Sequence, residues 1–336
     1  LLLNGKISNV SYSLINCNVQ DVNKQLSLLN AFGKKANVSF YLNINKIRTK
    51  TESSNKYLTL LKKYWGEKAE FRNISIYKDP AVSTELIELS QGFLINNVID
   101  QIKKAKSNSN YSDIIITAPT GSGKSIFFQL PSIYLHNESN LITIVITPLI
   151  ALMNDQVKEI TEQHGVDFAT YINSDITFEE RQNRMNGIKN GEYSMVYLSP
   201  ELLLANDVRS IIGDREIGLF VVDEAHLVTS WGRDFRVDYW FLGDYIEKTR
   251  RGSYYTKEKS MQFPVLCLTA TAVFGGTDDV IGELQKSLNL SCSSENIFFG
   301  SVRRDNPSHS IGFKIDVVGE KKFNTNKEEK INLACS

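Results

Sequence analysis

The sequence predicts an α/β protein in which a mainly parallel β-sheet lies between two layers of helices. Three observations support this prediction. Short, continuous apolar segments recur after residue 113, and segments with apolar residues at helical spacing separate them. The chain of 336 residues, with 42% hydrophobic and 23% charged residues, is large enough to bury a substantial core. Continuous apolar strands that alternate with helices are typical of a parallel sheet covered on both faces.

The expected elements follow one another in a regular order. A helix is expected at residues 86–104, and a polar loop at 105–112 separates it from the first strand. The strands are expected at residues 114–117, 141–147, 194–198, 219–222 and 265–269. The helices between and after them are expected at residues 124–135, 150–162, 178–190, 239–250 and 277–288.

The first part of the chain has a different composition, rich in Asn, Lys, Ser and Ile. Residues 38–42 and 73–77 alternate like short strands, and residues 58–65 have helical spacing. We therefore expect a small α+β accessory module of unknown role at 1–82. The main domain is then expected at 83–312, with a linker or the start of a further domain at 313–336.

Charge and cysteine content restrict the possible partners. Lys and Arg together number 38, as do Asp and Glu, so nucleic-acid binding would need a local basic patch. The cysteines, Cys17, Cys267, Cys292 and Cys335, show no metal-ligand spacing, so no zinc site is expected. Reduced thiols suggest a cytoplasmic protein. No apolar run approaches the ~20 residues that a membrane span requires, so no membrane partner is expected.

Residues 118–125 read APTGSGKS and follow the first predicted strand directly. In the P-loop pattern G-x-x-x-x-G-K-[ST], loop N–H groups and the start of the following helix hold phosphates. Ala118 replaces the first glycine. A simple Gly/Ser turn with an exposed lysine is the alternative, but the predicted strand and helix supply the context that the motif requires. The expected phosphate-binding residues are Thr120, Gly121, Ser122, Gly123, Lys124 and Ser125, with the Ser125 hydroxyl also on Mg²⁺.

Residues 218–226 read GLFVVDEAH, a buried strand that ends in two carboxylates. Ligand sites of open α/β sheets lie at the carboxyl ends of the strands. Asp223 is therefore expected beside Ser125, where it would bind Mg²⁺. Glu224 would orient or activate the water that attacks the γ-phosphate. Taken alone, such a pair is usually a solvated turn and His226 a structural histidine; the preceding P-loop favours the catalytic interpretation.

At these residues the sequence resembles the superfamily 2 helicases. APTGSGKS is similar to their motif I, DEAH at 223–226 to their motif II, and LTATA at 268–272 to their motif III. Further segments resemble the RecQ-like helicases within this group, over roughly residues 85–310. These segments are TPLIALMNDQV at 147–157, YLSPE at 197–201, SWGRDFRVDY at 230–239 and, more loosely, FGSVRRDN at 299–306.

This resemblance implies the first RecA-like domain of a P-loop NTPase that uses ATP and Mg²⁺ to unwind DNA. The partner domain, a second RecA-like domain outside this chain, would supply an arginine finger worth about 10³–10⁵ in rate. The chain alone is therefore expected to bind ATP weakly and hydrolyse it slowly. By resemblance, the catalytic residues are Lys124, Asp223 and Glu224, and the coupling residues are His226, Thr269 and Thr271.

The segment at 230–239 also makes physical sense as a DNA contact. Bases stack on aromatic faces for about 1–3 kcal/mol each, and arginines bind phosphates. A packed loop with its tryptophan in the core is the alternative. The expected DNA-binding residues are Trp231, Arg233, Phe235, Arg236 and, in the motif Ia segment, Pro148.

Some alternatives stay open at this point. Gln91 is either the adenine-reading glutamine of the family or a plain residue on a helix surface. The whole chain could also be a nucleotide-switched module that binds DNA or a partner, or an RNA-directed translocase of the same superfamily. The intact Glu224 favours an ATPase over a switch, and the segment at 230–239 favours DNA.

Overall fold

The computed structural model describes residues 54–78, 86–228, 241–252, 260–270 and 279–300. All of them belong to Lys46–Val302, one of the two units into which the chain divides. The predicted strand at 38–42, the linker at 313–336 and the loop at 230–239 lie outside these residues.

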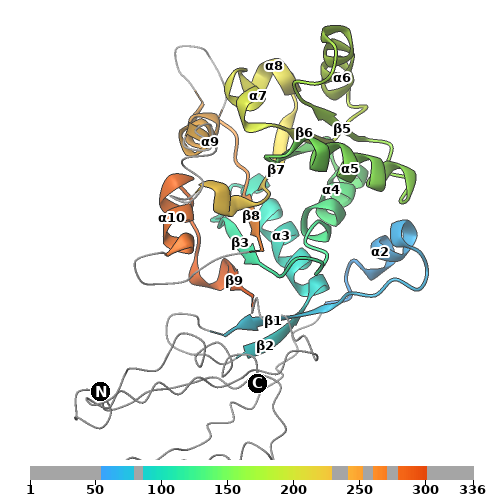
Figure 1. Ribbon diagram of the computed structural model, residues 1–336. Coiled ribbons are helices and arrows are strands. Elements are labelled where there is room, and N and C mark those ends of the chain that lie inside the picture. Colours follow the sequence, from blue (N-terminus) through green and yellow to red (C-terminus); the bar gives the residue numbers. More distant parts are fainter. Residues whose placement is uncertain (1–53, 79–85, 229–240, 253–259, 271–278, 301–336) are drawn as a thin grey trace, which may run out of the picture. The chain divides into compact units, whose positions relative to one another are not determined.

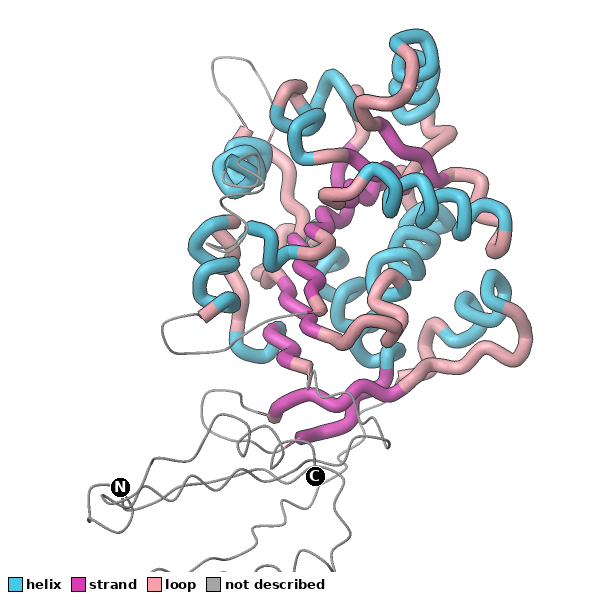
Figure 2. Tube along the Cα trace, viewed as in Figure 1, coloured by secondary structure: helices cyan, strands magenta, loops and turns pink. Residues whose placement is uncertain are grey.

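A seven-stranded parallel sheet forms the centre of this unit, in the order β5-β6-β4-β7-β8-β3-β9 (Figures 1 and 2). Two short strands at its edges, β5 and β9, have no counterpart among the predicted strands, whereas the other five appear where the sequence placed them. The strands are β3 (Ile114–Thr117), β4 (Leu141–Ile146), β5 (Ala169–Ile172), β6 (Met195–Leu198), β7 (Glu216–Val222), β8 (Val265–Thr269) and β9 (Ile297–Phe299).

Helices cover both faces of the sheet, as the sequence predicts, with α3, α4 and α5 on one side and α9 and α10 on the other (Figure 1). Alternate strand residues enter two separate cores; Ile114 and Ile116 pack into one and Ile115 into the other. The longer helices are α3 (Gln91–Lys106), α4 (Ile126–Glu138), α5 (Ile150–Glu162), α6 (Phe178–Asn190), α9 (Leu242–Arg251) and α10 (Val280–Ser287). Short helices, α7 (Pro200–Leu204) and α8 (Val208–Ile212), follow β6. Within the described residues, no helix combines the length and the apolar character needed to span a membrane.

The predicted helix at 86–104 is wrong over its first five residues, which form strand β2 (Leu86–Ser90). β2 pairs antiparallel with β1 (Asn73–Tyr77). Ser90 ends the strand and caps α3, because its side chain accepts a hydrogen bond from the Phe93 N–H at 3.1 Å. Helix α2 (Leu58–Trp65) forms as predicted, and its Leu61 packs into the same core as α3 and α4.

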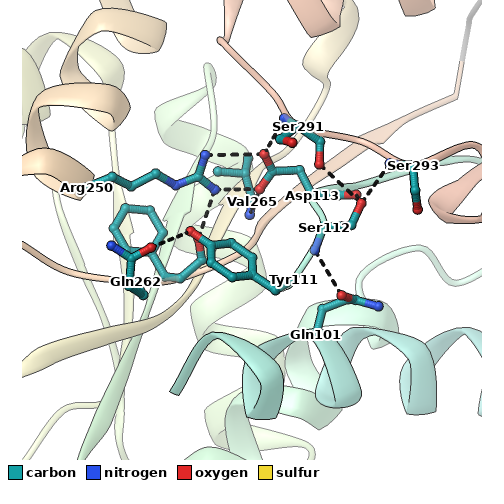
Figure 3. Close-up of polar contacts among 10 residues, drawn as sticks. Gln101, Tyr111, Ser112, Asp113, Arg250, Gln262, Val265, Ser291 and Ser293 are labelled. Carbon is teal, nitrogen blue, oxygen red and sulfur yellow. Dashed lines mark hydrogen bonds and ion pairs between the residues drawn. The ribbon is translucent and has the colours of Figure 1, made fainter. Parts of the chain in front are cut away.

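A buried ion pair fastens several segments together at the amino ends of β3 and β8 (Figure 3). The Asp113 carboxylate receives a bidentate contact from the Arg250 guanidinium at the end of α9. It also accepts the N–H groups of Val265 and Ser291, each at 2.8 Å. Asp113 is 1% exposed in its side chain and Arg250 15%. This carboxylate therefore joins the chain before β3 to α9, β8 and the segment after α10.

The end of β9 is joined closely to the end of β3. The Gly300 N–H donates to the Thr117 backbone carbonyl at 3.1 Å and to its side-chain oxygen at 2.6 Å. A Cβ atom at Gly300 would lie 2.2 Å from the Thr117 carbonyl oxygen, closer than any side chain tolerates. Only glycine fits at this position.

His136 in the last turn of α4 makes stability sensitive to acid. Its ring stacks on Phe168 at 3.7 Å between centroids, and its Nδ1 lies 2.9 Å from the Ser194 hydroxyl, which also accepts from Arg215. Burial lowers the pKa of His136, so the folded chain keeps it neutral when the unfolded chain, with a pKa of about 6.5, takes up a proton. Stability should therefore fall as pH drops below about 6.5. We expect melting temperatures of His136→Gln to fall less steeply between neutral pH and about pH 5; an unchanged slope would contradict this.

Candidate functional site

The loop after β3 has the backbone shape that the P-loop motif requires. Gly121 and Gly123 have φ angles of +82° and +78°, in the region that favours glycine. A Cβ at Gly121 would meet nothing within 4 Å, so open space lies in front of the loop. Thr120 is exposed, and Ala118, at the position of the first motif glycine, is buried and donates its N–H to the Thr269 carbonyl at 3.0 Å. Alanine is accommodated because its small side chain packs into the hydrophobic core.

Lys124 and Ser125 lead into the first turn of α4. The Lys124 ammonium donates to the Ala118 carbonyl at 3.4 Å, a weak contact that leaves most of its donor capacity unused. Ser125 stands at the N-cap of α4, yet its hydroxyl makes no capping hydrogen bond. The Ser122 hydroxyl is buried and has no partner among the described residues. Positive charge, hydroxyl groups and the start of a helix thus converge at one place, which is a favourable site for an anion.

Gln91 forms hydrogen bonds with the phosphate loop and with the segment before β1. Its Nε2 donates to the Ser122 carbonyl at 3.0 Å, and its Oε1 accepts the Arg72 N–H at 3.0 Å. The side chain is 5% exposed. Gln91 therefore links the phosphate loop to the segment that leads into β1.

Asp223 and Glu224 follow β7 and lie near the lysine of the loop. The Lys124 charge acts on both carboxylates and favours their ionised forms. Burial, together with the neighbouring Glu224 charge, raises the pKa of Asp223, which is 5% exposed. The hydrogen bond from His226 lowers the pKa of Glu224. The charge of the loop lysine therefore acts on an acidic pair that is distant from it in sequence.

Glu224 has a backbone conformation that is unusual for a residue with a side chain. Its φ angle is +47°, in the left-handed region that non-glycine residues rarely adopt. The Glu224 N–H donates to the Asp223 Oδ1 at 3.0 Å. Strained positions of this kind cluster at functional sites.

His226 connects the acidic pair to the end of β8. Its Nδ1 lies 3.3 Å from the Glu224 Oε2 and 3.0 Å from the Thr269 hydroxyl. Thr269 is fully buried, and its carbonyl receives the N–H of Ala118 from the phosphate loop. Two of the three predicted coupling residues, His226 and Thr269, are thus in direct contact. The third, Thr271, lies outside the described residues.

Of the predicted DNA-binding residues, only Pro148 is among the residues that the structure describes. Trp231, Arg233, Phe235 and Arg236 lie outside the described residues. Pro148 is buried at the end of β4 and lines a groove of about 620 Å³. This groove extends over the carboxyl ends of neighbouring strands, away from the phosphate loop.

Two residues near these sites were missed from the sequence. Gln156 on α5 is 8% exposed, and its side chain lowers the pKa of Asp223. Gln156 lies inside the segment at 147–157. The sequence alone does not show that α5 follows a strand, β4, that is adjacent to β7 in the sheet. Arg181 on α6 lines the groove beside Pro148. No motif covers α6, so nothing in the sequence distinguishes Arg181 from other surface arginines.

The residues present fit a magnesium-bound triphosphate. Within the described ranges, no group of three or more His, Cys, Asp or Glu could hold a metal ion. Mg²⁺ in nucleotide sites usually needs only one or two protein ligands, because phosphates and water provide the rest. The Ser125 hydroxyl and the Asp223 carboxylate are hard oxygen donors of the right kind, and the Lys124 ammonium carries the charge that can offset phosphate.

Comparison with known proteins decides the family. The sequence model of the DEAD/DEAH box helicase family matches residues 97–279, which is more than half of the chain. The chain belongs to this family. The matched region begins within α3 and contains the phosphate loop, the acidic pair and Thr269. This helicase ATPase domain has RecQ helicases among its relatives.

Two of these relatives are bacterial. The chain is 31% identical over 202 residues to the ATP-dependent DNA helicase RecQ of Haemophilus influenzae, and the match covers 60% of this chain and 29% of that protein. It is 34% identical over 197 residues to the RecQ helicase of Bacillus subtilis, with coverages of 57% and 31%. The chain therefore spans about a third of the length of these curated relatives.

Solved helicase structures are similar at a lower level. The helicase domain of Hef from Pyrococcus furiosus aligns with a TM-score of 0.40 and 19% sequence identity, over 61% of this chain and 38% of that one.

Proposed function

We propose that this chain is the ATP-binding half of a RecQ-like DNA helicase, a motor whose ATP hydrolysis is stimulated by DNA. One observation carries the proposal: Thr269, at the end of β8, accepts the Ala118 N–H of the phosphate loop at 3.0 Å and contacts His226, next to the acidic pair, at 3.0 Å. Phosphoryl transfer depends mainly on positioning and charge neutralisation, and the side chains of Lys124, Asp223 and Glu224 can supply both.

The phosphate loop would bind the triphosphate. Backbone N–H groups around Gly121 and Gly123 would surround the phosphates, and Lys124 would leave its weak contact with Ala118 to bind their oxygens. Gln91 holds the Ser122 carbonyl, so the loop keeps its shape before the nucleotide arrives. Whether Gln91 also reads the adenine base stays a proposal, since one donor of its amide remains available for it.

Ser125 and Asp223 would hold the metal, and Glu224 would act on water. Mg²⁺, when bound, offsets negative charge on the phosphates. The Glu224 carboxylate, whose pKa is lowered by its hydrogen bond with His226 and by Lys124, stays ionised at neutral pH and can orient or deprotonate a water. His226 then links any movement of Glu224 to Thr269 and so to β8.

The remaining parts of the motor are also proposals. DNA would lie across the carboxyl ends of the strands, near Pro148 and the segment that contains Trp231, Arg233, Phe235 and Arg236. A second RecA-like domain would close over the nucleotide. The relatives named above are DNA helicases of about twice this length, which supports both expectations.

Glu224→Gln tests the proposal in a longer form of the protein that includes a second RecA-like domain. The amide keeps the shape of the side chain but cannot take a proton, so ATP turnover should fall by about 100-fold or more. Binding of a fluorescent ATP analogue to residues 1–336 should stay within a few fold. Turnover that is unchanged in Glu224→Gln would overturn the catalytic role of Glu224.

The choice of nucleic acid needs a separate measurement. Stimulation of ATP hydrolysis should be stronger with DNA than with RNA of the same sequence. Greater stimulation by RNA would instead support an RNA-directed translocase of the same superfamily.

A further inference from the structure

Two threonine hydroxyls on β4 lie inside the protein without a hydrogen-bond partner among the described residues. Thr143 and Thr147 are both 0% exposed, and the side-chain oxygen of each is buried and unpaired. Buried hydroxyls nearly always have a partner, because an unpaired one has lost its hydrogen bonds to water and gained none in return. An unpaired hydroxyl in a native core therefore needs an explanation, and the surroundings of Thr147 supply one.

The sheet register places Thr147 directly beside Asp223. Ile146 and Val222 are paired at the ends of β4 and β7. The Asp223 N–H donates to the Ile146 carbonyl at 2.9 Å, so the pairing continues by one residue beyond both strands. Thr147 and Asp223 therefore lie opposite each other on segments that are about 4.8 Å apart.

The side chains of Thr147 and Asp223 lie on the same face of the sheet. Successive strand residues point to opposite faces, and Val145 and Val221 pack into one shared core. Thr147 and Asp223 each come two residues after one of these valines, so their side chains point to the same side. The Thr147 hydroxyl and the Asp223 carboxylate are thus neighbours in a region from which water is largely excluded.

Asp223 can accept a further hydrogen bond. Its Oδ1 accepts the Glu224 N–H at 3.0 Å, and a carboxylate offers about four acceptor positions in all. The residue is only 5% exposed, so water supplies little of what remains. A hydroxyl that donates to this carboxylate would stabilise the charged form, which is the form that binds a metal ion.

We propose that Thr147 is a positioning residue for the metal site, and that its hydroxyl donates a hydrogen bond to the Asp223 carboxylate when nucleotide and Mg²⁺ bind. The inference rests on the proposed function, because it adds a residue to the metal site proposed there. A hydrogen bond of this kind fixes the direction of a metal-binding carboxylate and so determines how tightly the metal is held. Thr147 would act through Asp223 and would not touch the reacting atoms.

Thr143 represents the structural alternative. It comes four residues earlier on the same strand and face, about 13 Å away along the chain, and its hydroxyl is equally buried and unpaired within the described residues. Its partners on the neighbouring strands, Met195 and Leu219, are apolar and offer no carboxylate. If threonine stands on β4 only because β-branched residues suit strands, Thr143 and Thr147 should behave alike.

Thr147→Val is the decisive variant, with Thr143→Val as its matched control and Thr147→Ser as the conservative variant. Valine has the shape of threonine without the hydroxyl, whereas serine keeps the hydroxyl and loses the methyl group. Binding of a fluorescent ATP analogue to residues 1–336 is measured over a series of Mg²⁺ concentrations and in EDTA. Thermal melting of each variant is measured without nucleotide and Mg²⁺.

We expect Thr147→Val to need about 10-fold to 100-fold more Mg²⁺ for half-maximal binding, as for other groups that orient a metal ligand. Its binding in EDTA should be unchanged, a difference that general damage to the site would not produce. Thr147→Ser should stay within a few fold of the unmodified chain, and Thr143→Val should match it at every Mg²⁺ concentration. Neither valine variant should melt at a lower temperature, because each loses a hydroxyl that has no partner.

Several results would overturn the inference and leave the proposed function standing. An unchanged Mg²⁺ requirement of Thr147→Val would do so. An equal shift in Thr143→Val would indicate a packing effect, and an equal loss of binding in EDTA would indicate a distorted site. A lower melting temperature of Thr147→Val alone would show that its hydroxyl already has another partner.

Failure of the proposed function would be recognised in the unmodified chain. If this chain binds the ATP analogue neither in Mg²⁺ nor in EDTA, the nucleotide site of the proposed function fails together with this inference. If the chain binds the analogue equally well at every Mg²⁺ concentration, the proposed metal site fails, and the role of Thr147 fails with it.

Discussion

Lys124→Ala should bind ATP about 10- to 100-fold more weakly than the unmodified chain, because a charge-assisted contact to phosphate is lost. In a longer form with a second RecA-like domain, ATP turnover should fall by about 1000-fold, since the same ammonium offsets charge that develops in the transition state. Binding of a fluorescent ATP analogue and release of inorganic phosphate measure the two effects.

The fold should survive this change. The Lys124 ammonium makes only the 3.4 Å contact to the Ala118 carbonyl, so its loss should shift the melting temperature little. Lys106→Ala is the matched control, because Lys106 pairs with Glu216 at 3.0 Å, and neither residue belongs to the nucleotide site. ATP binding that is equal in the two variants would show that the phosphate loop does not hold the nucleotide.

Arg250→Ala should reduce the free energy of unfolding by about 3–5 kcal/mol, the cost of leaving a buried charge without its partner. Asp113 would keep the N–H donors of Val265 and Ser291 but lose both guanidinium bonds (Figure 3). Denaturant unfolding, followed by circular dichroism, measures this loss.

The neighbouring arginine supplies the control. Arg251 is 77% exposed in its side chain and pairs with Glu247 on the surface, so Arg251→Ala should cost no more than about 1 kcal/mol. Similar losses of unfolding free energy in the two variants would mean that burial of the Asp113–Arg250 pair does not determine how much the pair stabilises the fold.

The centre of the sheet was predictable from the sequence because its strands are continuous apolar segments, such as Ile114–Thr117 and Val265–Thr269. The edge strands β5 and β9 were not, because Ala169–Ile172 and Ile297–Phe299 are short and owe their structure to pairing with β6 and β3. The start of α3 was misplaced for a similar reason. Leu86–Ser90 has apolar residues that also suit a helix, and only pairing with β1 makes it a strand.

For the site, the prediction rests on motif spacing. The order of Lys124, Ser125, Asp223 and Glu224 along alternating strands and helices was enough to predict one nucleotide site. Contacts made by isolated side chains were beyond prediction. The two bonds of Gln91 to Ser122 and Arg72 depend on distances across the fold that no local pattern encodes.

The junction of Gly300 with Thr117 has a mechanical consequence. The two hydrogen bonds of the Gly300 N–H anchor the polypeptide at the final residue of β3, immediately before the loop that begins at Ala118. Any tension applied to the chain after Gly300 would be borne first by these bonds. A force applied after Gly300 would therefore reach Thr117 first. Since Ala118 follows Thr117 directly, this force would act on the phosphate loop before it acted on the rest of the fold.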